Sequence, residues 1–275
     1  MGRRGLRLPA RCRDGRVAGH PQRLPQGAAA QRGGVSLMGT CACTCREGSG
    51  SYGRRLERRR AMDALFSAPA VVDVMAGEGL GESGRADLRR LVGLEWEQFD
   101  AVLGMNGRAG CQDDLRSFLS YRCAQYLAFP HPLIPLVLGE YVEAERTGRN
   151  LVEEKYARMM AVTDPDGYQR DWARRLGTPS PVRAAALRQI RALLSPALES
   201  AARELPQSHR HARPDESVPG RVSALDYFEA EVAGYSLGTL FALRDALGEQ
   251  LKHTNPIALS YVLAARLGKA TEAIS

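Results

Sequence analysis

Residues 86–103 read ADLRRLVGLEWEQFDAVL and repeat apolar side chains at helical spacing. An α-helix completes a turn in about 3.6 residues, so residues three and four positions apart share a face. The apolar residues that share one face here are Leu88, Leu91, Val92, Phe99 and Val102. Similar spacing recurs along the chain, and we find no convincing strand and no internal repeat. The sequence therefore predicts an all-α fold.

Helical periodicity begins near residue 62 and continues to the end of the chain. Proline, glycine and capping residues divide it, for example at Pro130, Gly148 and Asn150. The further helices that we expect are 113–129, 133–147, one that opens at Asn150, one that opens at Ser180, a long one over 223–251 and one that opens at Asn255. We expect residues 62–275 to form a single-domain bundle of seven or eight helices.

Charge is distributed unevenly along the chain. Residues 1–61 hold 14 arginines and three acids, a net charge of +11. The remaining residues hold 38 − 14 = 24 basic and 31 − 3 = 28 acidic side chains, a net charge of −4. We expect residues 1–61 to be a disordered basic tail, and we expect the true start of the protein at Met38 or Met62. The rest of the chain lacks the overall basic excess of a nucleic-acid-binding protein.

Composition predicts a soluble cytoplasmic protein. Hydrophobic residues make up 44% and charged residues 25% of the chain, and no apolar run approaches the ~20 residues that span a membrane. Of the six cysteines only Cys111 and Cys123 follow the tail, which is no disulfide framework. The His209-x-His211 pair stands in a polar loop, and no P-loop or zinc-binding pattern is present. We expect neither metal nor cofactor.

Polar side chains interrupt the apolar faces of the predicted helices. They stand where helical spacing would place core residues, and they are Glu95, Arg122, Gln125, Lys155, Glu231 and Tyr235. A buried unpaired charge costs several kcal/mol, so these groups should meet one another. They could form a structural ion-pair network or line a polar pocket between helices, and the sequence leaves both readings open.

The segment GRAGCQDD, residues 107–114, joins the helix that carries Glu95 to the helix that carries Arg122. Cys111 could be a nucleophile beside Arg108, although a small buried cysteine is the commoner case. The aspartates could cap the next helix or bind a ligand. We favour the aspartates over the cysteine as functional groups.

The pocket reading assigns a role to each polar residue. Catalytic groups would be Glu95, Asp113, Glu231 and Tyr235, with a glutamate as base or amine ligand and the tyrosine as proton relay. Substrate-binding groups would be Arg108, Arg122, Gln125, Lys155 and Arg158, with the cationic side chains holding a carboxylate or phosphate.

Five segments together resemble a bacterial and fungal family classed as a domain of unknown function. They are LEWEQF (94–99), GRAGCQDD (107–114), YRCAQYLAF (121–129), GRNLVEEKYARMMAVTDP (148–165) and YFEAEVAGYSLGTL (227–240), within residues 85–270. Some fungal relatives are arginine-containing cyclodipeptide synthases, which use aminoacyl-tRNA and an acidic DDxxE motif. The resemblance implies amide-bond formation, tRNA as a partner and Asp113 and Asp114 as the acidic pair. Ser117 stands where the motif has its glutamate.

These observations favour an enzyme with a polar inter-helical pocket for an amino acid or an aminoacyl-tRNA-like substrate. The alternative from another class is a non-catalytic module that binds a small metabolite or a partner helix. A bundle whose buried charges only fix its structure is a third reading. The oligomeric state is not predicted.

Overall fold

The computed structural model describes residues 47–103, 108–218 and 220–274, and its helices confirm the all-α fold. Within these ranges thirteen α-helices and one 3-10 turn form, with no strand. The α-helices are α1 (Glu47–Ser67), α2 (Pro69–Gly77), α3 (Glu82–Asp100), α4 (Leu115–Ala128), α5 (Leu133–Arg146), α6 (Leu151–Thr163), α7 (Pro165–Asp171), α8 (Ala173–Leu176), α9 (Pro181–Glu204), α10 (Pro206–Arg210), α11 (Ala224–Val232), α12 (Leu237–Gln250) and α13 (Pro256–Glu272). The 3-10 turn η1 spans Gly110–Asp113. The number exceeds seven or eight because short helices fill several connections.

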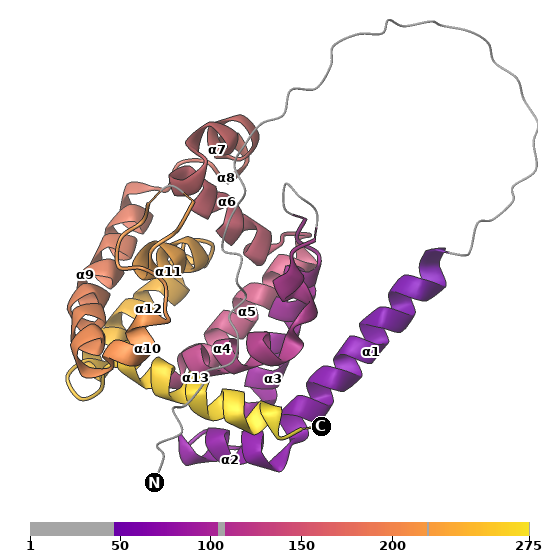
Figure 1. The fold of residues 1–275 in the computed structure, drawn as a ribbon. Helices are drawn as coiled ribbons and strands as arrows, with labels where there is room; N and C mark the ends of the chain where they lie inside the picture. The colour runs from indigo at the N-terminus through magenta and orange to yellow at the C-terminus, as the bar shows by residue number, and fades with distance from the viewer. Residues whose placement is uncertain (1–46, 104–107, 219, 275) are drawn as a thin grey trace, which may run out of the picture.

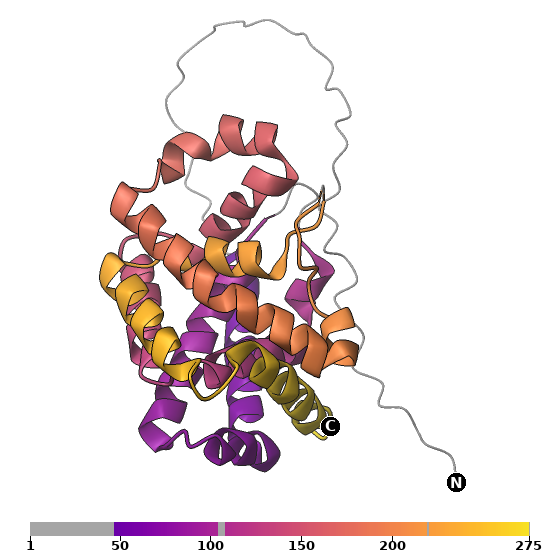
Figure 2. The same ribbon diagram turned by 90° about the vertical axis from the view of Figure 1, so that its left-hand side faces the viewer.

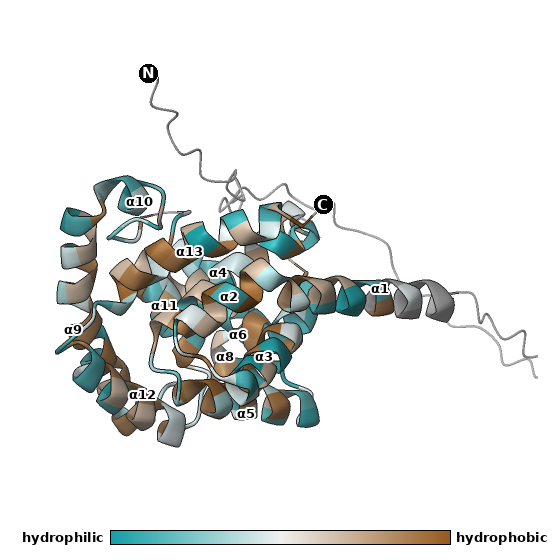
Figure 3. Ribbon diagram, turned by 90° about the horizontal axis from the view of Figure 1, so that it is seen from below, coloured by the Kyte–Doolittle hydropathy of each residue, from teal (hydrophilic) through white to brown (hydrophobic). Residues whose placement is uncertain are grey.

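Helix α4 lies among the other long helices, packed against α13 and α3. Helix α5 covers another part of α3, and α6 packs against α11. The long α9 runs across the side that faces the viewer in Figure 2 and contacts α11, α12 and α13. Hydrophobic and hydrophilic residues alternate in patches along helices such as α13 (Figure 3), as amphipathic packing requires. Eight residues of α4 are buried, so this helix crosses the core.

Helix α1 begins upstream of the expected domain boundary at residue 62. Its N-terminal part extends away from the other helices (Figure 1), while its C-terminal part buries Met62, Leu65 and Phe66. Arg58 forms an ion pair with Asp100, and Arg59 forms one with Glu97 at 2.8 Å. Two of the arginines that suggested a disordered tail therefore form ion pairs with acidic side chains of α3. The part of the predicted tail at residues 1–46 lies outside the described residues.

The prediction of one long helix over 223–251 is wrong, because α11 and α12 are separate helices. Ser236 caps α12, and its hydroxyl oxygen accepts from the backbone N–H of Thr239 at 3.2 Å. The guanidinium of Arg183 donates to the carbonyl oxygens of Ala233, at 3.0 Å, and Tyr235. Apolar spacing continues through the break, so only Gly234 and Ser236 mark it in the sequence.

Two predicted helix starts are confirmed by their caps. The side-chain oxygen of Asn150 accepts from Glu153 N–H at 2.9 Å, and that of Ser180 accepts from Arg183 N–H at 3.3 Å. Such caps satisfy backbone donors that the first helical turn leaves free. Across the described ranges no helix is both long and apolar enough to cross a membrane.

Candidate functional site

Four charged side chains from four helices meet inside the protein. Glu95 comes from α3, Arg122 from α4, Lys155 from α6 and Glu231 from α11, and none is more than 6% exposed. We call these four residues the ionic cluster. Each was predicted from its position on an apolar helix face, and the prediction that they converge is confirmed.

Glu231 lies at the centre of the ionic cluster. Its carboxylate accepts from the Arg122 guanidinium at 2.8 and 3.2 Å, from Lys155 Nζ at 2.5 Å and from Gln125 Nε2 at 3.1 Å. Burial alone would raise the pKa of Glu231, but the charges of Arg122 and Lys155 outweigh it and lower that pKa to about 2. The carboxylate therefore stays ionised at neutral pH and is a weak base.

Arg122 connects Glu231 to Glu95. Its Nε lies 2.7 Å from Glu95 Oε1, and its other nitrogens donate to Gln125 Oε1 at 2.6 Å and to the Tyr126 hydroxyl at 2.8 Å. The Tyr126 hydroxyl donates in turn to Glu95 Oε2 at 3.0 Å. Two positive and two negative charges make the ionic cluster neutral, as a buried group of charges requires.

Tyr235 adjoins the ionic cluster from the connection between α11 and α12. Its side chain is buried, and burial raises its pKa well above the ordinary value, as do the charges of Glu231 and Glu95. The hydroxyl therefore remains protonated. It can donate a hydrogen bond but does not accept a proton as a base at neutral pH.

Tyr227 was not among the predicted site residues, although it stands one helical turn before Glu231. Lys155 Nζ lies 3.7 Å and Arg213 Cζ lies 3.8 Å from the centre of its ring. Burial alone would raise the pKa of Tyr227, but Lys155 and Arg213 outweigh it and lower that pKa. The side chain is half-buried, so it links the ionic cluster to the surface. Its spacing from Glu231 was the available sequence signal.

Arg158 lies on α6 one turn beyond Lys155, outside the ionic cluster. Its Nη2 donates to Glu154 at 3.1 Å, and Glu154 also pairs with Arg149 at 2.8 Å. Its Nη1 is buried without a hydrogen-bond partner, and a side chain at Gly234 would begin 3.5 Å from it. Burial lowers the pKa of Arg158 despite Glu154.

Arg108 and Asp113 do not join the ionic cluster, which corrects the expectation that they line the same pocket. Arg108 donates to Asp113 Oδ1 at 3.0 and 3.1 Å and pairs with Asp100 at 2.5 Å. The Asp113 side chain is 66% exposed. The turn η1 buries Gln112 in place of Asp113, while Asp114 caps α4 by accepting from Ser117 N–H at 3.0 Å.

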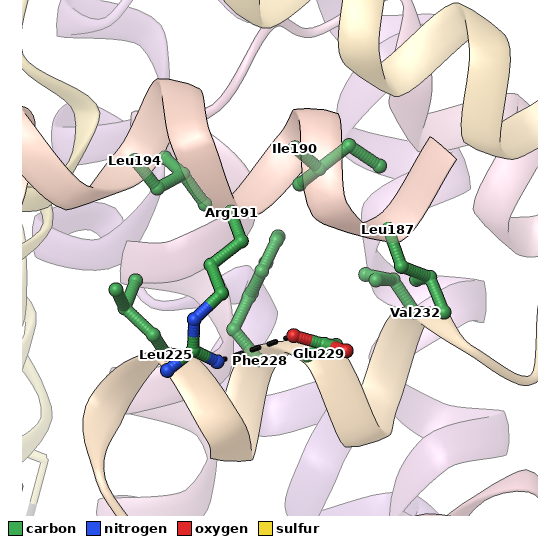
Figure 4. Close-up of a pocket in the computed structure, with 8 residues that line it drawn as sticks. All are labelled: Leu187, Ile190, Arg191, Leu194, Leu225, Phe228, Glu229 and Val232. Carbon is green, nitrogen blue, oxygen red and sulfur yellow. Dashed lines mark hydrogen bonds and ion pairs between the residues drawn. The ribbon is translucent and has the colours of Figure 1, made fainter. Parts of the chain in front are cut away.

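Two hollows lie between helices, and neither is lined by a member of the ionic cluster. The gap between α9 and α11 holds about 10 Å³, room for about one water molecule, and Arg191 pairs with Glu229 at 3.2 Å beside it (Figure 4). A larger hollow of about 280 Å³ lies among α1, α3, η1 and α4. Among the described residues, no group of three or more His, Cys, Asp or Glu side chains could hold a metal ion.

The ionic cluster lies inside a segment shared with other proteins. The model of the family DUF4125, described as a protein of unknown function, matches residues 88–268. The chain belongs to this family. The DUF4125 segment includes the ionic cluster, Tyr227 and η1, while α1 and α2 precede it. No curated protein and no solved structure matches the chain.

Proposed function

We propose that this DUF4125 protein is an enzyme that acts on a small amino-acid-derived substrate beside the ionic cluster. The observation that carries the proposal is the position of Tyr227, a half-buried tyrosine with two cationic groups within 4 Å of its ring. A tyrosine with a lowered pKa is suited to move a proton at a pH where ordinary tyrosines stay protonated.

The ionic cluster would act by fixing Lys155. Because Glu231 holds the ammonium at 2.5 Å, that charge stays next to the Tyr227 ring and stabilises the phenolate. Arg213 would bind a carboxylate or phosphate of the substrate, with the spare donor of Arg158 as a second anion-binding group. Gln125, which is half-buried and bonded to Glu231, would orient the substrate.

The most specific form of this proposal is amide-bond formation from an aminoacyl-tRNA, by the resemblance to cyclodipeptide synthases. Exposed arginines on α8 and α9 would contact tRNA phosphates: Arg174, Arg175 and Arg188. Arg183 and Arg191 are less suited to this role, because the first binds the carbonyls at the end of α11 and the second pairs with Asp226 at 2.6 Å.

Calorimetric titration of the full chain with the standard amino acids and aminoacyl-tRNAs tests the proposal, followed by mass spectrometry for an amide product. Tyr227→Phe should keep binding and lose turnover, because it removes only the hydroxyl. Arg213→Ala should weaken binding about tenfold. Tyr121→Phe, at an exposed tyrosine on α4, is the control. Absence of binding and of product with every compound would contradict the proposal.

The second candidate is a non-catalytic module that binds a partner helix or a metabolite. The observation in its favour is that every charge of the ionic cluster has an opposite charge within 3 Å, as a purely structural network would. Tyr227→Phe separates the two candidates, because it removes no charge of the ionic cluster. If the protein is an enzyme, turnover falls while stability holds; if the ionic cluster is only structural, neither ligand binding nor stability changes.

A further inference from the structure

Arg213 lies over the ring of Tyr227 although it comes from the connection between α10 and α11. We call residues 211–218 the Arg213 segment. Arg213 is exposed, and its guanidinium carbon lies 3.8 Å from the centre of the Tyr227 ring. A cation over a partly exposed ring gains less free energy than fixing the rotamers of an arginine costs. Contacts that fix the backbone around Arg213 must therefore help to hold it in place.

A histidine fastens the Arg213 segment to the rest of the protein. His209, on α10, has a side chain that is only 15% exposed, and its Nε2 lies 3.1 Å from Asp215 Oδ1. Its Nδ1 lies 3.2 Å from the Tyr261 hydroxyl of α13, and the two rings pack with their centres 6.2 Å apart. The contacts thus run from α13 through His209 to Asp215, which follows Arg213 by two residues.

The backbone next to Arg213 is bonded to α11, the helix that carries the tyrosine. The carbonyl oxygen of Pro214 accepts from Ala224 N–H at 2.9 Å. This bond fixes one point beside Arg213, about which the chain could still turn. A second contact just beyond it, between His209 and Asp215, limits that rotation. Together the two contacts set the direction in which the Arg213 side chain leaves the segment.

We propose that His209 and Asp215 position Arg213 over the tyrosine ring. Tyr261 supports them by holding His209 in place from α13. The inference rests on the proposed function, which assigns proton transfer to Tyr227 and anion binding to Arg213. A guanidinium that is already held in place binds an anion with a smaller loss of side-chain entropy. His209 acts through Asp215 and the Arg213 segment, so it is a positioning residue and not a catalytic one.

Alkaline titration of the full-length protein, followed by phenolate absorbance, tests the proposal without a substrate. Burial raises the pKa of Tyr227, and the charged groups that act on it are Glu231, which also raises it, and Lys155, Arg213 and Arg122, which lower it. Tyr227→Phe identifies the absorbance step that belongs to this tyrosine. His209→Ala should move that step to higher pH, as Arg213→Ala does. His209→Gln, which keeps a donor near the position of Nε2, should restore the wild-type step.

Asp215→Ala gives a test in which positioning and a direct charge effect have opposite signs. Removing a negative charge by itself favours the phenolate and lowers the pKa of a nearby tyrosine. If Asp215 positions Arg213, the pKa of Tyr227 should rise instead. The Asp215 side chain is 59% exposed, so this variant should fold even if His209→Ala does not. A fall in the pKa of Tyr227, or no change, would overturn the proposal.

A double variant separates positioning from a general effect on the structure. If His209 acts through Arg213, His209→Ala with Arg213→Ala should titrate where Arg213→Ala alone does. Shifts that add in the double variant, or a wild-type step in His209→Ala, would overturn the proposal. The matched control is His253→Ala, at a histidine 76% exposed just after α12, which should leave the step unchanged. Because the titration contains no substrate, its failure is distinct from a failure of the proposed function, which the turnover of Tyr227→Phe tests.

Discussion

Arg122 and Glu231 are separated by 109 positions in the sequence and are joined by two hydrogen bonds of 2.8 and 3.2 Å. The planar guanidinium presents paired donors that match the two oxygens of a carboxylate. This pairing links the side chains of α11 and α4, and the remaining donors of Arg122 lie toward Glu95 and Tyr126. Arg122 is therefore the group on which most of the ionic cluster depends.

Replacing the two cations should have unequal effects on stability. Arg122→Met leaves Glu95 without a counter-charge and Glu231 with that of Lys155 alone, and it should lower the free energy of unfolding by about 3–5 kcal/mol. Lys155→Met should cost less, about 1–3 kcal/mol, because Arg122 still holds Glu231. Urea unfolding followed by circular dichroism measures both losses of stability. The control is Arg146→Met, at an exposed arginine, which should leave the urea midpoint unchanged. A larger loss from Lys155→Met would contradict the arrangement.

Stability should fall in acid because of Glu231. Its pKa is about 2 in the folded protein against an ordinary value of 4.5, so the unfolded chain binds the proton more readily. The stabilisation is complete above about pH 4.5 and is lost as the pH falls toward 2. Urea titrations at several pH values should show this slope, and Glu231→Gln should reduce it. A variant with the wild-type slope would contradict the assignment, and Glu199→Gln serves as control.

Tyr227, which is half-buried, should ionise at a lower pH than the buried tyrosines Tyr126 and Tyr235. Lys155 and Arg213 lower its pKa, whereas burial raises the pKa of Tyr126 and Tyr235. Phenolate absorbance should therefore show an early step in an alkaline titration, which Tyr227→Phe removes and Arg213→Ala moves to higher pH. Persistence of the early step in Tyr227→Phe would assign it to another tyrosine.

Ser236 should contribute to stability and not to chemistry. Its hydroxyl oxygen caps α12, and the Glu140 carboxylate supports this turn by accepting from Ser236 N–H at 2.9 Å. Ser236→Ala should lower the free energy of unfolding by about 1 kcal/mol, with Ser236→Asn close to wild type. Thermal unfolding measures the difference. Loss of ligand binding without loss of stability would show that the hydroxyl has another role.

Helical spacing was enough to predict the ionic cluster. Each of its members occupies a position that an apolar residue would otherwise fill, and the cost of burying a lone charge implies that such residues meet. The same reasoning could not identify Arg213, because this residue lies in the connection between α10 and α11 and reaches Tyr227 only through the tertiary fold.

Other features depended on local conformation that periodicity does not report. The arginines of α1 resemble those of a tail until Asp100 and Glu97 are seen to face them. The two aspartates of GRAGCQDD diverge because η1 turns the chain between them, leaving Asp113 at the surface and Asp114 as a cap. Which of two adjacent residues a turn buries depends on backbone geometry, which composition does not fix.

The ionic cluster takes one residue from each of four helices, and it therefore couples the unfolding of these helices to one another. If α3, α4, α6 or α11 left alone, it would strand an opposite charge in an apolar interior. A partly unfolded intermediate that lacks one of these helices therefore has a higher free energy than it would have if the core were purely apolar. The most protected backbone amides of all four helices should exchange with deuterium through a single global opening and should report one common free energy of opening.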